Sequence, residues 1–310
     1  MKQLNLIGVD KYGYGQRNYA HNIDTFLSIP HTYSNYTHIY KNVYRENAIN
    51  HVLVGIPSYK KTDILTVHDI AYNYPNFVKT RFFAFLLRET LKRADRLIVY
   101  SHFMKSEIER FYQKEDVAIL SFGIDTTMFT DRLIEEARKK YYPEYDILIV
   151  SNLEQRKNIL PYLEILSKTF LRVRLIGKPV DKKLSQSIMK IVKRSPNIFY
   201  SVSVSSIQTE YMKSKILLHP ALYGGFEMPV AEASLMGLST LLYDYPLNRE
   251  LYGNAPNYLD YGEPTSEKLM ESIFEAVENN TSKNMASIVR KNHDIRKTIK
   301  QYEKFYEGIL

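Results

Sequence analysis

Strand-length apolar runs alternate with stretches of helical period along most of this chain, and the series occurs twice. Such alternation is typical of βαβ units, in which parallel strands are joined by crossover helices. The first series opens with the apolar run Leu4–Val9 and the second with Asp146–Ser151. We therefore predict an α/β fold with two Rossmann-like domains, each built around a parallel sheet.

The individual elements follow from the spacing of apolar residues, which has a period of two in strands and about 3.6 in helices. The predicted strands are Leu4–Val9, His38–Val43, His51–Ile56, Ile64–His68, Leu97–Ser101, Val117–Leu120, Asp146–Ser151, Val173–Ile176, Ile198–Tyr200, Ile216–His219 and Thr240–Tyr243. The predicted helices are Gln16–Leu27, Val78–Arg93, Lys105–Tyr112, Leu160–Thr169, Lys183–Val192, Ile207–Met212 and Val230–Met236.

The boundary between the two domains is predicted from a charged segment, Glu135–Pro143, that ends in Tyr-Tyr-Pro. Proline disfavours helix at the residue before it, so we place the linker there. After Asn284, apolar residues spaced mostly by threes and fours predict one long amphipathic helix. The predicted domains are residues 1–142, residues 143–283 and the C-terminal helix at 284–310.

Composition excludes several classes of protein. The chain has 310 residues and no cysteine, so it has no thiol nucleophile, thiolate metal site or disulfide. Its net charge of +8 is spread over both halves, which suits anionic substrates and argues against nucleic acid as a partner. No apolar run approaches the roughly 18 residues of a membrane span, and the first run is too short for a signal peptide. We expect a cytoplasmic protein.

One stretch leaves membrane contact open. Residues Lys79 to Arg93 are basic, aromatic and helical in period, so peripheral contact with an anionic membrane surface is an alternative to core packing.

The segment from Leu218 to Thr240 is the most informative part of the sequence. It predicts a buried strand that runs into a Gly-Gly loop and then into a helix whose first turn carries Glu227 and Pro229. Backbone N–H groups at such a helix start bind phosphate or diphosphate. Glu232 lies one turn further along, where its carboxylate can accept both hydroxyls of a ribose. The segment therefore predicts a nucleotide site.

This segment resembles the donor-binding motif of the retaining glycosyltransferases of family 4, which have the GT-B architecture of two facing Rossmann-like domains. Other segments resemble that family in the same order along the chain: Gly13-Tyr-Gly15, Leu65–Asp69, Arg93–Ser101, Phe122–Phe129, Ile149–Asn158 and Tyr252–Ala255. The resemblance spans residues 4 to 260. It implies a GT-B fold whose C-terminal helix crosses back onto the first domain.

The resemblance also implies roles for particular residues. A nucleotide-sugar donor is expected to contact Gly13, Gly15, Asn152, Arg156, Lys157, Gly224, Gly225, Phe226 and Glu232, with Lys157 on the diphosphate and Glu232 on the ribose. Catalytic roles are expected for His68, beside the donor sugar in the cleft between the domains, and for Glu227. Because cations are unfavourable at a helix start unless an anion is bound, the position of Lys157 favours a ligand role. Glu227 has an equally good alternative, since an acidic residue in the first turn also compensates the helix dipole.

Three positions depart from the family's pattern. Gly224 stands where the family has the first of two glutamates, and Glu227 stands where it has a small residue. Asn152 replaces an arginine that helps to neutralise the diphosphate, and Arg156 is the candidate replacement. These departures make a non-catalytic binder of sugar nucleotides or polyanions the alternative function.

The sequence contains no Asp-x-Asp pair, no P-loop, no His-Glu-x-x-His and no Gly-x-Ser-x-Gly motif. We therefore expect no metal and no cofactor besides the donor. The expected function is a retaining, metal-independent glycosyltransferase that moves a sugar from a nucleotide-activated donor to an acceptor. The acceptor stays open between a glycan, a lipid and a protein.

Overall fold

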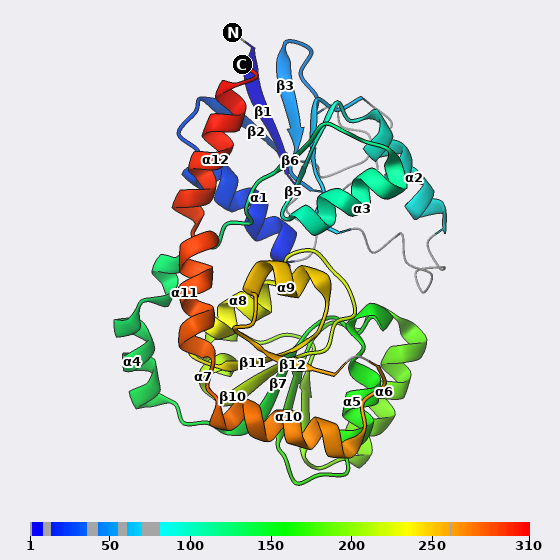
Figure 1. The fold of residues 1–310 in the computed structure, drawn as a ribbon, viewed down its shortest axis with the longest axis vertical. Helices are drawn as coiled ribbons and strands as arrows, with labels where there is room; N and C mark the ends of the chain where they lie inside the picture. Colours follow the sequence, from blue (N-terminus) through cyan, green and yellow to red (C-terminus); the bar gives the residue numbers. More distant parts are fainter. Residues whose placement is uncertain (1, 9–13, 36–42, 55–60, 70–80, 261) are drawn as a thin grey trace. The chain divides into compact units, whose positions relative to one another are not determined.

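The computed structural model describes residues 2–8, 14–35, 43–54, 61–69, 81–260 and 262–310. The chain divides into two compact units (Figure 1). Unit 1 comprises Met1–Asp125 together with Lys291–Leu310, and unit 2 comprises Thr126–Arg290. Each unit contains a six-stranded sheet. The predicted α/β class with two parallel sheets is confirmed.

Unit 1 is built on a sheet with the strand order β2-β1-β3-β4-β5-β6, and every neighbouring pair is parallel. Its strands are β1 (Gln3–Gly8), β2 (His31–Asn35), β3 (Ala48–Val52), β4 (Ile64–Thr66), β5 (Arg96–Val99) and β6 (Val117–Ile119). Its helices are α1 (Tyr14–Phe26), α2 (Arg81–Arg93), α3 (His102–Tyr112) and α12 (Ile295–Glu307). Because the strand order reverses at β1, right-handed crossovers place α1 on the opposite face of the sheet from α2 and α3 (Figure 1).

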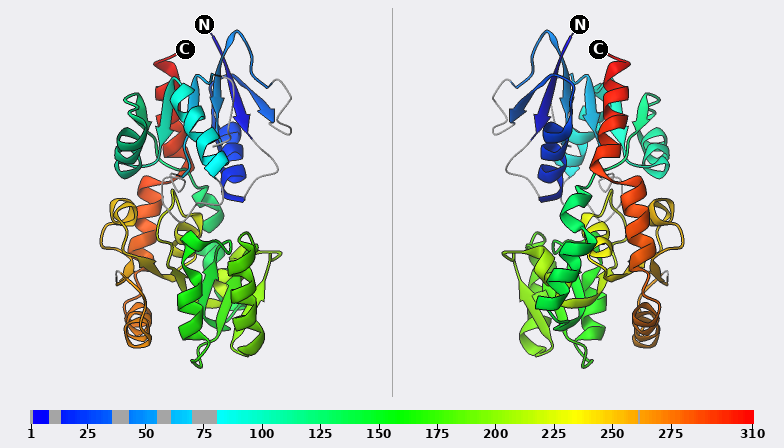
Figure 2. Two further views of the ribbon diagram at one scale, coloured as in Figure 1. Left: turned by 90° about the vertical axis from the view of Figure 1, so that its right-hand side faces the viewer. Right: turned by 90° about the vertical axis from the view of Figure 1, so that its left-hand side faces the viewer.

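The last helix, α12, packs beside α1 in unit 1 (Figure 2). Tyr302 and Tyr306 on this helix are completely buried. The Tyr302 hydroxyl hydrogen-bonds the Tyr19 hydroxyl of α1, and the Tyr306 hydroxyl lies 2.5 Å from Nδ1 of His51 on β3. The end of the chain is therefore part of the core of unit 1.

Unit 2 has the strand order β12-β11-β10-β7-β8-β9, again with parallel neighbours throughout. Its strands are β7 (Tyr145–Val150), β8 (Val173–Ile176), β9 (Ile198–Ser201), β10 (Ser214–His219), β11 (Ser239–Tyr243) and β12 (Asn257–Leu259). Its α-helices are α4 (Asp131–Lys140), α5 (Ile159–Leu166), α6 (Lys182–Arg194), α7 (Ile207–Met212), α8 (Met228–Leu235), α9 (Pro246–Tyr252), α10 (Ser266–Glu278) and α11 (Ser282–Asn292), which runs two residues past the unit boundary. The short 3-10 turns are η3 (Thr126–Phe129) and η4 (Gln155–Lys157).

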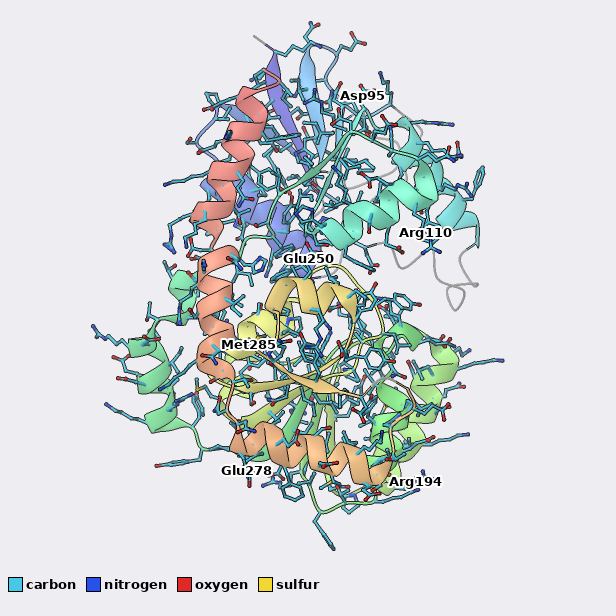
Figure 3. The ribbon with its side chains drawn as sticks, viewed as in Figure 1. Asp95, Arg110, Arg194, Glu250, Glu278 and Met285 are labelled. Atoms are coloured by element: carbon cyan, nitrogen blue, oxygen red, sulfur yellow. The ribbon has the colours of Figure 1, made fainter. Side chains whose placement is uncertain are left out.

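Helices cover the middle of the unit 2 sheet on both faces. In β10, Ile216, Leu217 and Leu218 are at most 1% exposed, which is the burial expected of a parallel strand packed on both sides. Helix α10 packs against β10, β11 and β12, α8 packs against β10 and β11, and α5 lies beside α6. Met285 of α11, labelled in Figure 3, is also completely buried.

Several helices begin where a short polar side chain accepts the first free backbone N–H groups. Ser101, Asp181, Thr265 and Asp294 cap α3, α6, α10 and α12 in this way. These caps fix the helix starts, and with them the short loops that follow the strands.

The segment Glu135–Pro143 differs from its prediction as a linker. Most of it belongs to α4, which begins after Thr130, whose side chain accepts the N–H of Leu133, and which buries Ile134. The division between the units falls at Asp125 and Thr126, earlier than the expected position after residue 142. The cap at Thr130 and the buried Ile134 hold this charged run as a helix.

The C-terminal helix also differs from its prediction, because it is two helices. Backbone hydrogen bonds join Ile124 to His293 and Ile295, and Asp294 then caps α12. These contacts interrupt the helical pattern between α11 and α12. Elsewhere, β2, β12, α9 and α10 were not predicted, and the predicted strand His38–Val43 lies almost entirely outside the described residues.

Candidate functional site

The strand order of unit 2 reverses between β7 and β10. In open parallel sheets, ligands bind beyond the carboxyl ends of the strands at such a reversal. The segments that follow these two strands are Ser151–Lys157 and Pro220–Glu227. They contain most of the residues predicted from the sequence for donor binding, so the topology brings these residues to one place.

Backbone contacts hold the two segments together. The N–H of Leu222 donates to the carbonyl of Arg156 at 2.9 Å, which ties the second segment to the first. Gly177, at the end of β8, lies against the first segment, since a Cβ atom there would be 1.7 Å from the carbonyl oxygen of Ser151. This close approach requires glycine and fixes the course of the chain toward η4.

The carboxylate of Glu227 is the centre of a charged cluster. Nζ of Lys157 lies 2.6 Å from its Oε1 and 2.7 Å from its Oε2. Nη1 of Arg156 is 3.7 Å from Oε1, and Nε2 of His219 is 3.4 Å from Oε2. Glu227 is the N-cap residue of α8, but its side chain makes no capping bond and turns to the cations instead. The position of Lys157 at a helix start predicts a bound anion, and here that anion is the Glu227 carboxylate of the same protein.

The electrostatics of this cluster keep Glu227 ionised. Burial alone would raise its pKa, but the charges of Lys157 and Arg156 and the contact with His219 hold the pKa well below its usual range. Burial lowers the pKa of His219 despite the attraction of Glu227. At neutral pH the cluster therefore contains an ionised Glu227, two cations and a neutral imidazole.

Arg156 hydrogen-bonds residues of both segments, Ser151–Lys157 and Pro220–Glu227. Its Nε donates to Oε2 of Glu154 at 2.9 Å, and its Nη1 donates to the carbonyl oxygen of Tyr223 at 3.3 Å. Asn152 is exposed and donates from Nδ2 to Oε1 of Glu154 at 3.3 Å. Glu154 thus accepts hydrogen bonds both from Asn152, which departs from the family pattern, and from Arg156, the candidate replacement for the missing arginine.

Glu232 lies further along α8 and is 7% exposed. Its Oε2 accepts a hydrogen bond from the Tyr211 hydroxyl at 2.9 Å. Burial raises the pKa of Glu232 to about 7, and the hydrogen bond from Tyr211 acts in the opposite direction. Near neutral pH this carboxyl group is therefore a mixture of the neutral and ionised forms.

The glycines and Phe226 complete the predicted set in unit 2. Gly224 and Gly225 are buried in the loop before α8, and Phe226 is half-buried beside them. A Cβ atom on Gly224 would lie 2.3 Å from Oε1 of Glu227. The backbone of Gly224 is not in the left-handed region, so space for the Glu227 carboxylate explains this glycine.

The remaining predicted residues, Gly13, Gly15 and His68, belong to unit 1, whereas the cluster around Glu227 belongs to unit 2. His68 follows β4 and is 9% exposed, with Nε2 donating to the carbonyl of Leu53 at 2.6 Å and Nδ1 accepting from the Tyr100 hydroxyl at 2.8 Å. Both ring nitrogens are thus bonded within the protein, and burial lowers the pKa of His68 to about 4. Gly15 is the second residue of α1, and Gly13 lies outside the described residues. The role of His68 beside a donor sugar stays a prediction.

Four residues near the site were not chosen from the sequence. Glu154 and Tyr211 are the partners of Arg156 and Glu232, and Nε2 of His219 lies 3.4 Å from Oε2 of Glu227. Tyr252 is completely buried, and within the described residues neither its hydroxyl nor Nε2 of His219 makes a hydrogen bond. Burial and the charge of Glu227 raise the pKa of Tyr252. Glu154, His219 and Tyr252 each lie in a segment that resembles the family, whereas Tyr211 lies in none of them.

Within the described ranges, no three His, Asp or Glu side chains are grouped as a metal ion would require. In the same part of the chain, every helix is too short or too polar to cross a membrane.

Two parallel-sheet units, with charged loops at the strand-order reversal of the second, define an α/β protein of the GT-B class. The sequence pattern of the family described as "Glycosyl transferases group 1" matches residues 131–295, just over half of the chain. The protein belongs to this family.

Among curated proteins, the chain is similar to the O-antigen chain mannosyltransferase RfbU of Salmonella typhimurium, at 24% identity over 227 residues. The match covers 70% of this chain and 61% of RfbU, so the chain spans about three fifths of the length of this relative.

Solved structures share the fold at low identity. WaaG, a glycosyltransferase involved in lipopolysaccharide biosynthesis, superposes with a TM-score of 0.72 at 16% identity, over 98% of this chain and 100% of WaaG. HepE of Anabaena, solved with UDP and glucose, gives 0.70 at 14% identity, over 99% and 100% of the two chains. A glycosyltransferase from Rickettsia africae gives 0.67 at 15% identity, over 100% and 99%.

Proposed function

We propose that the protein is a glycosyltransferase that takes a sugar from a nucleotide-activated donor bound at the carboxyl ends of β7 and β10. One observation carries this proposal. The cations Arg156 and Lys157 and the helix start at Glu227 converge at the strand-order reversal of unit 2, where parallel sheets bind nucleotides. A pair of cations beside a helix start is suited to a diphosphate.

The roles within the site follow from charge and position. Lys157 and Arg156 would neutralise the diphosphate as the bond to the sugar breaks, and Glu232 would accept the ribose hydroxyls. Membership of the family supports transfer with retention of configuration, in the manner of the family 4 enzymes that the sequence resembles. Because RfbU is named as a mannosyltransferase, mannose donors are the first to test.

We extend the proposal to catalysis without a metal, because two side-chain cations already stand where a metal would otherwise balance the phosphate charge. Turnover in the presence of a strong chelator tests this point. Loss of activity on chelation, with recovery on adding Mg²⁺ or Mn²⁺, would contradict it.

The experiment that tests the function is a panel of UDP-, GDP- and ADP-sugars, with release of the nucleoside diphosphate as the readout. We expect release from at least one donor, at a low rate by hydrolysis and faster when a suitable acceptor is added. Tight binding without release across the panel would instead support the non-catalytic binder.

The contribution of Lys157 can be tested by replacing it with alanine. Removing one charge-assisted contact worth about 1.5–3 kcal/mol should weaken binding of the active donor's nucleoside diphosphate by one to two decades. The variant also leaves the carboxylate of Glu227 without its closest cation. We therefore also expect a lower melting temperature.

A matched control exists on the same two strands. Lys215 of β10 pairs with Asp146 of β7 at 2.8 Å, near the amino ends of the strands that carry the site at their carboxyl ends. Lys215→Ala should leave nucleotide affinity unchanged. Wild-type affinity in the Lys157→Ala variant would place the diphosphate elsewhere.

A further inference from the structure

The cations that would bind the donor's diphosphate are already occupied by a carboxylate of the protein. Both oxygens of Glu227 lie within 2.7 Å of Nζ of Lys157, and Oε1 is also 3.7 Å from Arg156. These are the short distances of charge-assisted hydrogen bonds. In this conformation Glu227 holds the place of an anionic ligand.

The charges in the cluster are balanced without any ligand. Arg156 and Lys157 supply two positive charges, and Glu154 and Glu227 supply two negative charges in direct contact with them. A diphosphate would bring at least two further negative charges next to the carboxylate of Glu227. Because like charges at contact distance repel strongly in a buried site, the diphosphate and this carboxylate cannot both occupy the cation pair.

The position of the Glu227 carboxylate depends on Gly224. A Cβ atom on residue 224 would lie 2.3 Å from Oε1 of Glu227 and 3.3 Å from Nη1 of Arg156. The backbone of Gly224 is not in the left-handed region, so an alanine fits the backbone but collides with the carboxylate. The glycine therefore makes the room in which Glu227 reaches the cations.

The Glu227 side chain is also the partner that can leave. Its exposed fraction is 16%, against 8% for Lys157, and it makes no capping bond at the start of α8. Rotation of this side chain toward solvent would take its carboxylate away from both cations, whereas Lys157 is enclosed. Of the two partners, Glu227 is therefore the one with the shorter path to solvent.

We propose that Glu227 is an internal anion that occupies the cation pair in the absence of donor and is displaced by the donor's phosphate groups. This inference rests on the proposed function, because it assigns the same site. The displaced carboxylate competes with the nucleoside diphosphate product, so it lowers product affinity and speeds product release. Glu227 thus sets the balance between holding the donor and releasing the nucleotide.

The test uses inorganic pyrophosphate as the probe, with binding to the full chain measured by titration calorimetry. Glu227→Gln removes the competing charge and keeps the shape of the side chain, so it should bind pyrophosphate about ten-fold or more tighter than wild type. Gly224→Ala keeps every charge but pushes the carboxylate off the cations, so it should also bind tighter, by a smaller factor. Asp146→Asn, which removes a carboxylate from the Lys215 pair at the other end of the same strands, is the control and should bind as wild type does.

The second variant keeps the inference testable if the first folds poorly. Glu227→Gln removes the carboxylate closest to Lys157, whereas Gly224→Ala changes no charge. Thermal unfolding of both variants shows which fraction is folded. Affinity equal to or weaker than that of wild type in both variants, or no binding by any of the proteins, overturns the internal-anion role.

The donor panel separates this inference from the proposed function. Tighter pyrophosphate binding in the variants, together with no nucleoside diphosphate release by wild type, would support the internal anion and refute the transferase. Release by wild type with no gain of pyrophosphate affinity in the variants would support the transferase and refute the internal anion. Where wild type is active, Glu227→Gln should lower kcat and KM together, since slower product release limits turnover.

Discussion

Glu232 is the residue whose charge state we expect to couple stability to pH. Burial raises its pKa to about 7 from 4.5, and the hydrogen bond from Tyr211 offsets this only in part. Between these two values the folded protein binds more protons than the unfolded chain. The stability that Glu232 contributes is therefore complete below pH 4.5 and is lost as the pH rises through about 7.

We expect Glu232→Gln to be more stable than wild type at pH 8, by up to about 3 kcal/mol, and close to wild type at pH 5. Glutamine resembles the protonated acid and cannot ionise, which removes the cost of a buried charge. Urea unfolding of both proteins at the two pH values measures the difference, and Glu275→Gln, exposed on α10, is the control. A difference between variant and wild type that is the same at both pH values would refute the shifted pKa.

For the site residues, the sequence predicted which single residues matter but not which partners they contact. Lys157 and Glu227 are 70 positions apart, and Tyr211 and Glu232 are 21 apart. Both separations are much longer than the repeat of a helix or a strand, so no local spacing pattern in the sequence predicts these contacts. Lys157 and Glu227 meet because β10 lies beside β7, and that neighbour relation is a property of the sheet. Tyr211 and Glu232 meet because α7 and α8, the helices before and after β10, pack together there. The same holds for His68, whose bonds to Leu53 and Tyr100 depend on which strands flank β4.

Helix α12 is the element whose polar contacts we expect to stabilise unit 1. Thr66 of β4 hydrogen-bonds both Nε2 of His51 and the hydroxyl of Tyr19, which are the partners of Tyr306 and Tyr302. The helix is therefore joined to the sheet and to α1 by one buried network. Removal of a hydroxyl from such a network leaves its partner unsatisfied in the core.

Tyr302→Phe and Tyr306→Phe should each destabilise unit 1 by about 1–3 kcal/mol, although each keeps the aromatic ring. Hydrogen exchange followed by mass spectrometry should show faster exchange in residues 1–125 and little change in residues 140–280. Tyr142→Phe, at a side chain 75% exposed, is the control. Exchange in unit 1 that stays at the wild-type rate in both variants would mean that the helix is held by apolar packing alone.

Elements with a clear apolar period could be predicted from the sequence, and the others could not. Strands such as β7 and β10 were found because they are buried on both faces. Strand β2, His31–Asn35, has polar residues and only intermediate burial, so it gave no signal. The break between α11 and α12 was missed because Ile295 continues the apolar spacing, while the interruption comes from backbone bonds to Ile124, far away in the sequence.

For the whole molecule, two parallel-sheet units could be predicted, but the path of the chain between them could not. Unit 1 is discontinuous, since Lys291–Leu310 returns to Met1–Asp125. The return of the last helix was expected from the resemblance and not from its apolar spacing. The spacing shows that a helix has a face to bury, and the buried polar partners His51 and Tyr19 determine where it is buried.

The two units are expected to differ in their response to acid. Among the residues of unit 1 that the structure describes, burial lowers the pKa of three histidines, His51 to about 3, and His68 and His293 to about 4. In the unfolded chain the pKa of a histidine is 6.5. Below pH 6.5 the unfolded chain therefore binds protons at these histidines, whereas the folded unit does not. Stability is therefore complete above pH 6.5 and is lost as the pH falls. At pH 5 the loss is about 2 kcal/mol for each histidine, because a folded pKa near 3 or 4 leaves all three neutral.

Unit 2 has opposing groups and should resist the same change. Burial lowers the pKa of His219, which costs stability in acid, whereas Glu232 gains stability as the pH falls through about 7. Limited proteolysis at pH 7.5 and pH 5, with cleavage sites read by mass spectrometry, should show new cuts within residues 1–125 at pH 5 while residues 126–290 persist. His51→Asn cannot take up a proton on unfolding, so it should move the onset of these cuts to lower pH, measured against its own pH 7.5 pattern. Cuts that begin in both units at one pH, or an onset unchanged in His51→Asn, would show that the buried histidines do not set the acid limit of unit 1.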